Sequence, residues 1–133
     1  MRVADLMQSN VRSIAAEATV LDAVTTMADS HVSGLPVVDP VGRVIGVVTA
    51  TDVLQAEAEQ DDTRSRSRLF EHTTVRDLMT HEPHLIAPDD DVRDAARQML
   101  YADVRRLFVA EKGRLVGVIS QTDIAQAVAT GRL

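Results

Sequence analysis

The chain has 133 residues and no cysteine, and its 20 acidic and 14 basic side chains give a formal charge of −6. This length fits one ordinary domain or two small halves that share a core. The lack of cysteine excludes disulfides and thiolate metal sites. The acidic balance and an aromatic content of 2% disfavour binding to nucleic acid by charge or by base stacking.

The N-terminal residues, Met1 to Asp5, lack the apolar region of a signal peptide. No apolar run approaches the roughly 20 residues that a membrane-spanning helix needs. The absence of cysteine fits a reducing compartment. We therefore expect a soluble, cytoplasmic protein that does not associate with membranes.

The chain contains an internal duplication. Laying Val3 on Val75 aligns Asp5-Leu6-Met7 with Asp77-Leu78-Met79 without a gap, and the register continues through both copies. A one-residue gap at a later turn then aligns Gly46 with Gly117. We predict one repeat over residues 1–60, a charged linker over 61–72 and a second repeat over 73–133.

Each repeat predicts the element order β-α-β-β-α. In the first, a short segment over 3–7 precedes a brief strand at 13–15, a helix capped by Thr19, strands at 35–38 and 44–48, and a helix over 51–60. The second repeats this order with strands at 85–87, 107–110 and 115–119, and helices after residue 91 and over 122–130. Glycines between the paired strands favour hairpins. Neither half is expected to fold alone, because such a short chain buries too small a core.

The linker is polar and charged from Asp61 to Arg68, which predicts a solvated loop and makes it the best candidate for disorder. Its alternating arginines and serines also occur in RNA-contacting segments. Two neighbouring aspartates favour the loop over RNA contact.

One stretch, Gly46-Val47-Val48-Thr49-Ala50-Thr51-Asp52, recurs as Gly117-Val118-Ile119-Ser120-Gln121-Thr122-Asp123. In each, a buried strand gives way to a helix at a hydroxyl residue, with an aspartate three positions later. This spacing fits a capping box, which alone would explain it. It also fits a ligand site, because a helix N-terminus can hold a phosphate and an ionised aspartate can accept both hydroxyls of a ribose. The glycines would let a flat base or a neighbouring backbone approach closely.

The doubled corner, together with Gly34-Leu35-Pro36-Val37-Val38-Asp39 and the repeated Asp-Leu-Met openings, resembles the tandem cystathionine β-synthase (CBS) domain pair. The resemblance covers nearly the whole chain outside the linker. It implies an α+β fold of two pseudo-symmetric β-α-β-β-α repeats packed through their sheets, with two clefts. Such clefts commonly bind adenine nucleotides or S-adenosylmethionine. Such modules usually regulate an attached enzyme, channel or transporter, and two of them often pair as a homodimer.

The resemblance also implies roles for individual residues. Asp52 and Asp123 would hold the ribose hydroxyls, and Thr49, Thr51, Ser120 and Thr122 would line the sugar and phosphate. Ile14, Ala15, Ile86 and Ala87 would border the base, with the backbone around Leu35, Pro36, Leu107 and Phe108 completing each pocket.

The two copies differ where the phosphate is expected. Arg105 and Arg106 stand in the second copy at positions where family members that bind nucleotide phosphates often place basic residues, whereas the first copy has Ser33 and Gly34. The alternative is that two arginines keep a strand edge soluble. Phe108 replaces the proline of the first copy. We therefore expect two unequal sites, one of which could remain empty.

Other groups of polar residues give weaker indications of function. The four histidines are scattered, and Asp89-Asp90-Asp91 fits a helix cap better than a cation site. The spacing supports neither a catalytic residue nor a metal ligand, so we do not expect an enzyme, and no cofactor is required. The resemblance implies a sensor of an adenine nucleotide such as AMP, ADP or ATP, whose binding favours one arrangement of the two repeats, or of the dimer, and signals to an unknown effector protein. The alternatives are a ligand-free dimerisation scaffold and a sensor of S-adenosylmethionine or NAD.

Overall fold

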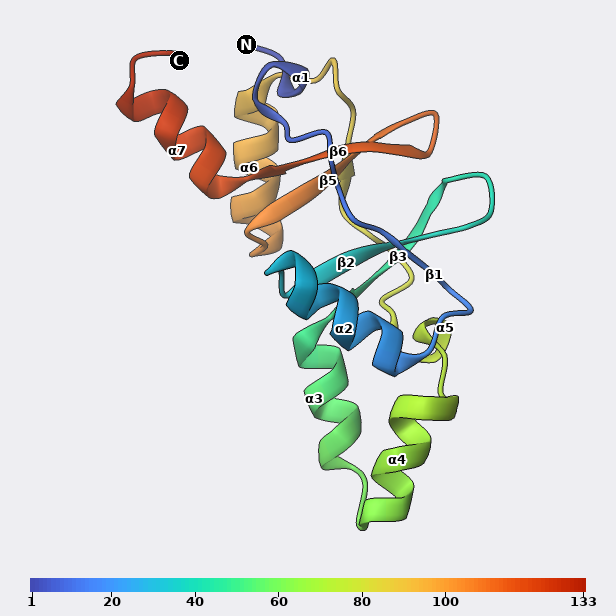
Figure 1. Cartoon of the computed structure of the whole chain (residues 1–133). Coiled ribbons are helices and arrows are strands. Elements are labelled where there is room, and N and C mark those ends of the chain that lie inside the picture. Colours follow the sequence, from blue (N-terminus) through green and yellow to red (C-terminus); the bar gives the residue numbers. More distant parts are fainter. The chain divides into compact units, whose positions relative to one another are not determined.

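The computed structural model describes residues 1–133 and contains seven helices and six strands, which form two three-stranded sheets (Figure 1). The chain forms two compact units. Unit 1 comprises Met1–Val11 and His84–Leu133, and unit 2 comprises Arg12–Pro83. The longest helices have eleven residues, and none of the seven has the length and apolar character to cross a membrane.

Unit 2 contains the first sheet and the helices that pack on it. Its elements are β1 (Ile14–Ala15), α2 (Val20–Ser30), β2 (Gly34–Val38), β3 (Val44–Thr49), α3 (Ala50–Ala58), α4 (Thr63–His72) and α5 (Val75–Leu78). In the sheet β1 runs parallel to β2, and β2 forms an antiparallel hairpin with β3.

Unit 1 repeats this arrangement, but its first helix comes from the start of the chain. Its elements are α1 (Val3–Leu6), β4 (Leu85–Ile86), α6 (Val92–Ala102), β5 (Arg106–Glu111), β6 (Arg114–Ser120) and α7 (Gln121–Ala129). Here β4 is parallel to β5, and β5 is antiparallel to β6. The predicted β-α-β-β-α order is therefore confirmed in both repeats.

Side-chain caps fix where the two longest helices begin. The backbone N–H of Asp22 donates to Thr19 Oγ1 at 3.1 Å, as expected for the N-cap of α2. At α6 the N–H of Arg93 donates to Asp91 Oδ1 at 2.8 Å, and this bond holds the pKa of the Asp91 carboxyl below its usual value. Asp91 thus acts as a cap, as the sequence predicted for the aspartate run.

Apolar residues at helical and strand spacing fill one core in each unit. Val20, Ala23 and Met27 of α2 pack with Leu35, Val37 and Val48 of the unit 2 sheet. Their repeat equivalents in unit 1, including Val92, Ala95 and Met99 of α6, pack with Leu107, Val109 and Ile119. Both helices therefore turn the predicted apolar stripe inward.

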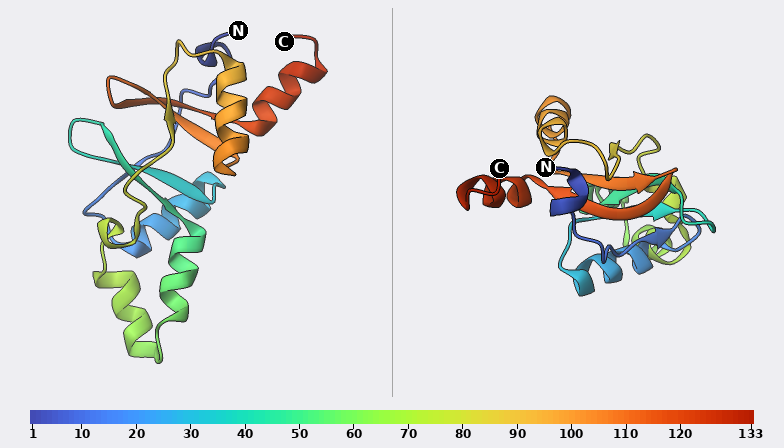
Figure 2. Two further views of the ribbon diagram at one scale, coloured as in Figure 1. Left: turned by 180° about the vertical axis from the view of Figure 1, so that it is seen from behind. Right: turned by 90° about the horizontal axis from the view of Figure 1, so that it is seen from above.

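The prediction of a solvated, disorder-prone linker is wrong, because residues 63–72 form helix α4, which runs beside α3 (Figures 1 and 2). The N–H of Ser65 donates to Asp62 Oδ1 at 2.7 Å, which caps the helix and lowers the pKa of that carboxyl. Leu69 is only 6% exposed and joins the unit 2 core, with Phe70 packed against the same cluster. Burial of these two side chains anchors a helix whose remaining surface is charged.

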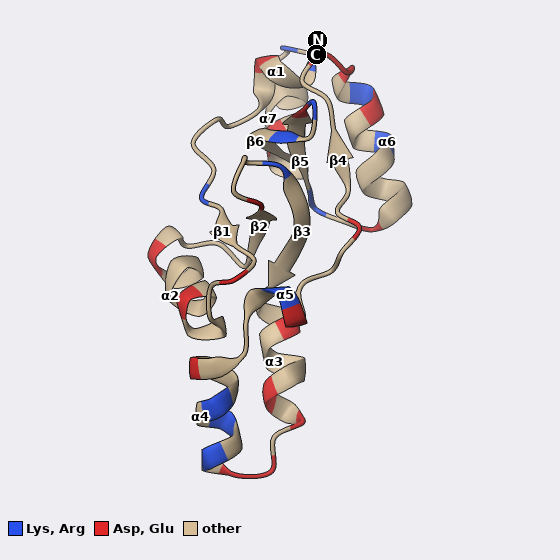
Figure 3. Cartoon of the chain, turned by 90° about the vertical axis from the view of Figure 1, so that its right-hand side faces the viewer, with Lys and Arg blue, Asp and Glu red and all other residues tan.

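Ion pairing also favours α4. Arg66 Nε lies 3.0 Å from Glu57 Oε1 on α3. In Figure 3 the basic bands of α4 lie beside the acidic bands of α3. At these exposures the pair contributes little stability by itself, about 0–1 kcal/mol, so the apolar contacts of Leu69 and Phe70 dominate.

A two-residue backbone ladder joins the segment that follows each one-turn helix, α5 or α1, to the sheet of its unit. In unit 2, the N–H of Val47 donates to the carbonyl of Thr80 at 3.0 Å, and the reverse bond is 2.9 Å. In unit 1, Gln8 and Val118 exchange the same pair of bonds at 2.8 and 2.9 Å. This ladder places residues 1–11 in the unit that contains the second sheet.

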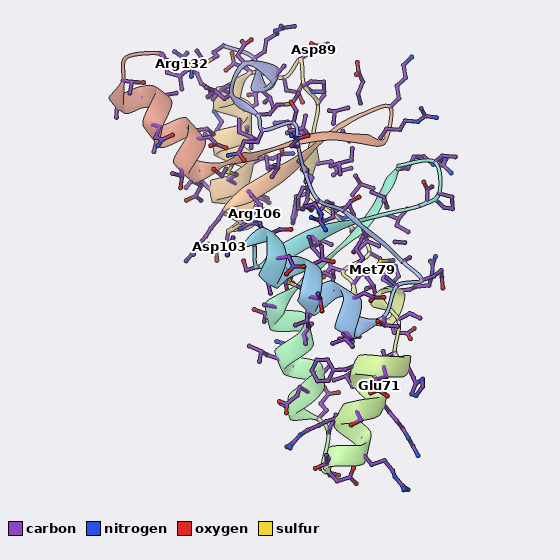
Figure 4. The ribbon with its side chains drawn as sticks, in the orientation of Figure 1. Glu71, Met79, Asp89, Asp103, Arg106 and Arg132 are labelled. Carbon is purple, nitrogen blue, oxygen red and sulfur yellow. The ribbon has the colours of Figure 1, made fainter.

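Glycine is required beneath both ladders. A Cβ at Gly46 would lie 2.7 Å from the Thr80 carbonyl oxygen and 2.7 Å from Met79 Sδ, which Figure 4 shows beside β3. A Cβ at Gly117 would lie 2.8 Å from the Gln8 carbonyl oxygen. Of the two predicted reasons for these glycines, the close approach of neighbouring backbone is the one present in the structure.

We expect Gly46→Ala and Gly117→Ala each to lower the free energy of unfolding by about 1–3 kcal/mol, because backbone must move to admit the methyl group. Urea denaturation followed by circular dichroism measures this loss. Gly34→Ala is the control, since its Cβ would meet Thr49 Cγ2 at an ordinary 3.5 Å. An equal loss in all three variants would contradict the steric explanation.

Candidate functional site

Both strand-to-helix corners form complete capping boxes. At the β3–α3 corner the N–H of Thr49 donates to Asp52 Oδ2 at 2.8 Å, and the N–H of Asp52 donates to Thr49 Oγ1 at 3.2 Å. The β6–α7 corner has the same two bonds between Ser120 and Asp123, at 2.9 and 3.1 Å. The capping prediction is therefore confirmed at both positions.

Each box uses one carboxylate oxygen and leaves the other available. Asp52 Oδ1 accepts no hydrogen bond from the protein, and Asp123 Oδ1 accepts only a long one, 3.4 Å, from Gln8 Nε2. Both carboxylates are half-buried. Capping and acceptance of a ligand hydroxyl are therefore compatible at the same aspartate.

The first turn of each helix also retains one free amide. The N–H of Gln121 donates to the Arg105 carbonyl at 2.9 Å, and the N–H of Ala50 donates to the Ser33 carbonyl at 2.8 Å. With the boxes formed, the amides of Thr51 and Thr122 have no protein acceptor, and both threonine side chains are exposed. Each corner thus offers an N–H group and a hydroxyl at the positive end of a helix.

The arginines predicted for phosphate lie beside the unit 1 corner. Arg106 begins β5 and pairs directly across the hairpin with Ser120, while the Arg105 carbonyl holds the start of α7. Neither guanidinium has a carboxylate within ion-pair distance. Figure 4 shows Arg106 at the end of unit 1 where α6 leads into β5.

In unit 2 the equivalent positions bear no charge. Gly34 pairs across the hairpin with Thr49, and Ser33 is exposed. The structure therefore brings Ser33, Gly34, Thr49 and Asp52 together at one corner, and the corresponding arginines, Ser120 and Asp123 at the other.

The residues expected near the base lie farther along the strands. Ile14 and Ala15 pair with Val37 and Val38, three residues beyond Gly34, or on the order of 10 Å along the strand. In unit 1, Ile86 pairs with Val109 in the same way. The structure does not place these residues directly beside the corners.

Several predicted site residues contribute side chains to the core. Ile14, Leu35, Pro36, Ile86, Leu107 and Phe108 are buried, whereas Ala15 is exposed and Ala87 is half-buried. The buried side chains present little surface, and backbone contact by the Leu-Pro and Leu-Phe pairs remains a prediction. Phe108, which stands where the first copy has Pro36, is 5% exposed.

The sequence missed Gln8, which reaches Asp123 through its side chain and lies in the ladder to β6. Its repeat equivalent is Thr80. The different polar residues at this position of the two repeats were only a weak indication that Gln8 belongs to the site. No group of three or more histidine, aspartate or glutamate side chains is placed to share a metal ion.

Comparison with known proteins supplies the family. The model of the CBS domain matches the chain twice, over residues 3–59 and 75–130. Protein MJ1225 of Methanocaldococcus jannaschii, itself uncharacterised, is 31% identical over 121 residues, which cover 91% of this chain and 40% of that protein. The chloroplastic CBS domain-containing protein CBSX2 of Arabidopsis thaliana is 26% identical over 94% of this chain and 62% of its own length. The chain thus spans less than two thirds of both relatives.

Solved structures agree with the fold. The crystal structure of CBSX2 in complex with AMP has a TM-score of 0.83 and 27% identity, covering 99% of this chain and 98% of that chain. The CBS domain pair of protein MJ0100, solved with 5-methylthioadenosine and S-adenosyl-L-methionine, has a TM-score of 0.82 at 20% identity, which supports the fold alone.

We expect Thr49→Ala and Ser120→Ala each to cost about 0.5–2 kcal/mol of unfolding free energy, because each removes the acceptor of a box. Thr51→Ala and Thr122→Ala, at exposed positions two residues later, should change it by less than about 0.5 kcal/mol. Thermal denaturation of the four variants measures both effects. Similar losses in both pairs would contradict a special role for the box.

Proposed function

The chain belongs to the CBS-domain family as a tandem pair, and on this premise we propose that it is a regulatory module that binds an adenine nucleotide at its strand-to-helix corners. The proposed ligand class is AMP, ADP or ATP. Binding would favour one conformation over another and so signal the nucleotide level to a separate protein. We propose no catalytic role.

The observation that carries this proposal is the unpaired positive charge at the unit 1 corner. Arg105 and Arg106 have no acidic partner and flank a helix N-terminus whose Thr122 amide is free. Guanidinium groups and helix amides bind phosphate oxygens through charge-assisted hydrogen bonds.

The aspartates would hold the sugar. Oδ1 of Asp123, held only weakly by Gln8, and the free Oδ1 of Asp52 can each accept a ribose hydroxyl while Oδ2 keeps its cap. Ser120, Thr122, Thr49 and Thr51 would contact the sugar and phosphate from the same turns. The complex of CBSX2 with AMP, at 27% identity, supports this ligand class.

The two sites would differ in what they bind best. Unit 1 offers two guanidinium groups to a phosphate, whereas Ser33 and Gly34 of unit 2 offer none. We propose that unit 1 prefers the nucleotide and that unit 2 binds adenosyl ligands with less dependence on phosphate. The backbone around Leu35-Pro36 and Leu107-Phe108, with Ile14-Ala15 and Ile86-Ala87, would border the base.

A second candidate is a ligand-free scaffold, which the complete capping boxes favour because capping alone accounts for the hydroxyl residue and the aspartate at each corner. The two candidates differ in one measurable property. A scaffold would show no ligand-induced stabilisation.

We expect AMP at 100 times its dissociation constant to raise the free energy of unfolding by about 2.7 kcal/mol, seen as a thermal shift. The panel includes ADP, ATP, NAD, S-adenosylmethionine and adenosine. The double variant Arg105→Ala/Arg106→Ala should bind AMP at least tenfold more weakly and adenosine about equally, because only the phosphate contacts are lost.

The matched control is Arg114→Ala, an exposed arginine at the other end of the hairpin. Absence of a shift with every adenosyl ligand would favour the scaffold. An equal loss of AMP affinity in the control would remove the arginine pair from the site.

We also propose that two copies pair as a homodimer through α6. Leu100 and Tyr101 are adjacent on this helix and are 76% and 95% exposed. Two large apolar side chains together at a surface are typical of an interface. Their repeat equivalents are Ala28 and Asp29, so this surface is a feature of unit 1 alone.

We expect Tyr101→Glu to shift the chain from dimer to monomer in sedimentation equilibrium, because a buried carboxylate in the interface has no partner. Leu54→Glu, at a 66% exposed leucine of α3, is the control and should remain dimeric. A monomeric parent chain, or dissociation of both variants, would refute pairing through α6.

A further inference from the structure

Two exposed rows of side chains occupy equivalent positions on α2 and α6, the longest helices of the two repeats. The rows consist of Leu21, Thr25 and Asp29 on α2 and of Arg93, Arg97 and Tyr101 on α6. The residues of each row are four positions apart, so they lie on one face of their helix. Leu21 is 48% exposed and Tyr101 is 95% exposed. A group that covers either row therefore comes from another molecule.

The charged residue at the end of each row stands where its own helix disfavours it. Asp29 lies in the last turn of α2, where the helix dipole repels a carboxylate, and Arg93 lies in the first turn of α6, where it repels a guanidinium. Neither forms an ion pair within the chain. The cap residue Asp91 accepts the backbone N–H of Arg93 and not its guanidinium. A contact between the two charged side chains would compensate both placements.

The two rows are complementary when their helices run antiparallel. In each row the apolar residue and the outermost charged residue are eight positions apart, or about 12 Å along the helix. With Leu21 placed opposite Tyr101 in antiparallel helices, the charged ends also meet, and Asp29 lies opposite Arg93. A parallel arrangement would instead set the carboxylate against the tyrosine ring and the guanidinium against the leucine. Charge and apolar character therefore match in one direction only.

Pairing of α6 with the α6 of a second copy is less favourable. In Figure 3 the basic bands of α6 lie toward its start. In a parallel contact each arginine would face its own equivalent, and in an antiparallel contact centred on the row the two Arg97 side chains would meet. Like charges placed together at an interface disfavour that pairing. The row of α2 supplies a carboxylate and no cation, so it avoids this repulsion.

We propose that α2 of one copy docks antiparallel on α6 of a second copy, with Leu21 against Tyr101 and Asp29 against Arg93. This inference rests on the pairing through α6 proposed above and identifies the surface that α6 meets. Leu100, which is 76% exposed, enlarges the apolar end of the contact. The contact joins unit 2 of one copy to unit 1 of the other, so the two copies use different surfaces at each contact.

Cross-linking locates the contact, because the chain has no native cysteine. Thr25→Cys and Arg97→Cys each place one thiol at the centre of a row, at an exposed position. We expect a short bismaleimide to link the two variants when they are mixed, with one carrying a mass tag, and to link neither variant to itself. Self-linking of Arg97→Cys alone would overturn docking on α2 and leave the pairing through α6 intact.

A charge exchange tests the ion pair. Asp29→Arg and Arg93→Asp should each weaken dimerisation at least tenfold in sedimentation equilibrium, because each sets like charges opposite one another. Each change also places the new charge at the helix end that favours it, so loss of the helix does not explain a weaker dimer. The double variant Asp29→Arg/Arg93→Asp should recover most of the parental affinity, because the pair forms again with its charges exchanged.

The matched control is Glu71→Arg, the same change of charge at an exposed residue of α4 that forms no ion pair. It should leave the dissociation constant of the dimer unchanged. An equal loss in this control, or a double variant that dimerises as weakly as the single ones, would overturn the proposal. A monomeric parent chain would refute the pairing through α6 together with this contact, whereas the thermal shift with AMP tests the nucleotide site independently.

Discussion

The backbone ladder over Gly46 and Gly117 is the constraint on which the rest of the structure depends. Each ladder brings the segment after a one-turn helix against the middle of a hairpin, at a separation that excludes even a methyl group. Because the segment after α1 pairs with β6, the first eleven residues belong to the unit that contains the last fifty. The ladders also fix Gln8 beside Asp123 and therefore shape one of the two corners.

The corners show how structural and functional demands can share one set of residues. A capping box needs one oxygen of the aspartate, and the second oxygen remains for a ligand. Duplication supplied two such corners, and later divergence distinguished them, since arginines flank one and uncharged residues the other. The units also differ in that α4 packs in unit 2, while a cleft is open between α1 and α7 in unit 1. Each repeat therefore serves as an internal control for the structural features of the other.

Much of the fold was predictable because its signals are local. Alternating or continuous β-branched runs indicated β2, β3, β5 and β6, and Thr19 and Asp91 indicated helix starts that the structure confirms. Helix α4 was not predicted, because its charged composition concealed the anchors Leu69 and Phe70. The signal was available in Asp62, an N-cap residue seven positions before the apolar pair, but a helix this polar is stable only when its few apolar side chains find a core.

The sequence alone determined the duplication, the element order, the capping boxes and the resemblance to a tandem CBS pair, because each depends on residues close together in the chain or on a repeat. Only the tertiary structure decided that Gly46 and Gly117 serve a neighbouring backbone, that Arg105 and Arg106 lie unpaired beside the start of α7, and that Leu6 and Ala127 border a cleft. These facts depend on segments distant in sequence. Such contacts form because the whole core must be buried at once, and no local sequence pattern specifies them.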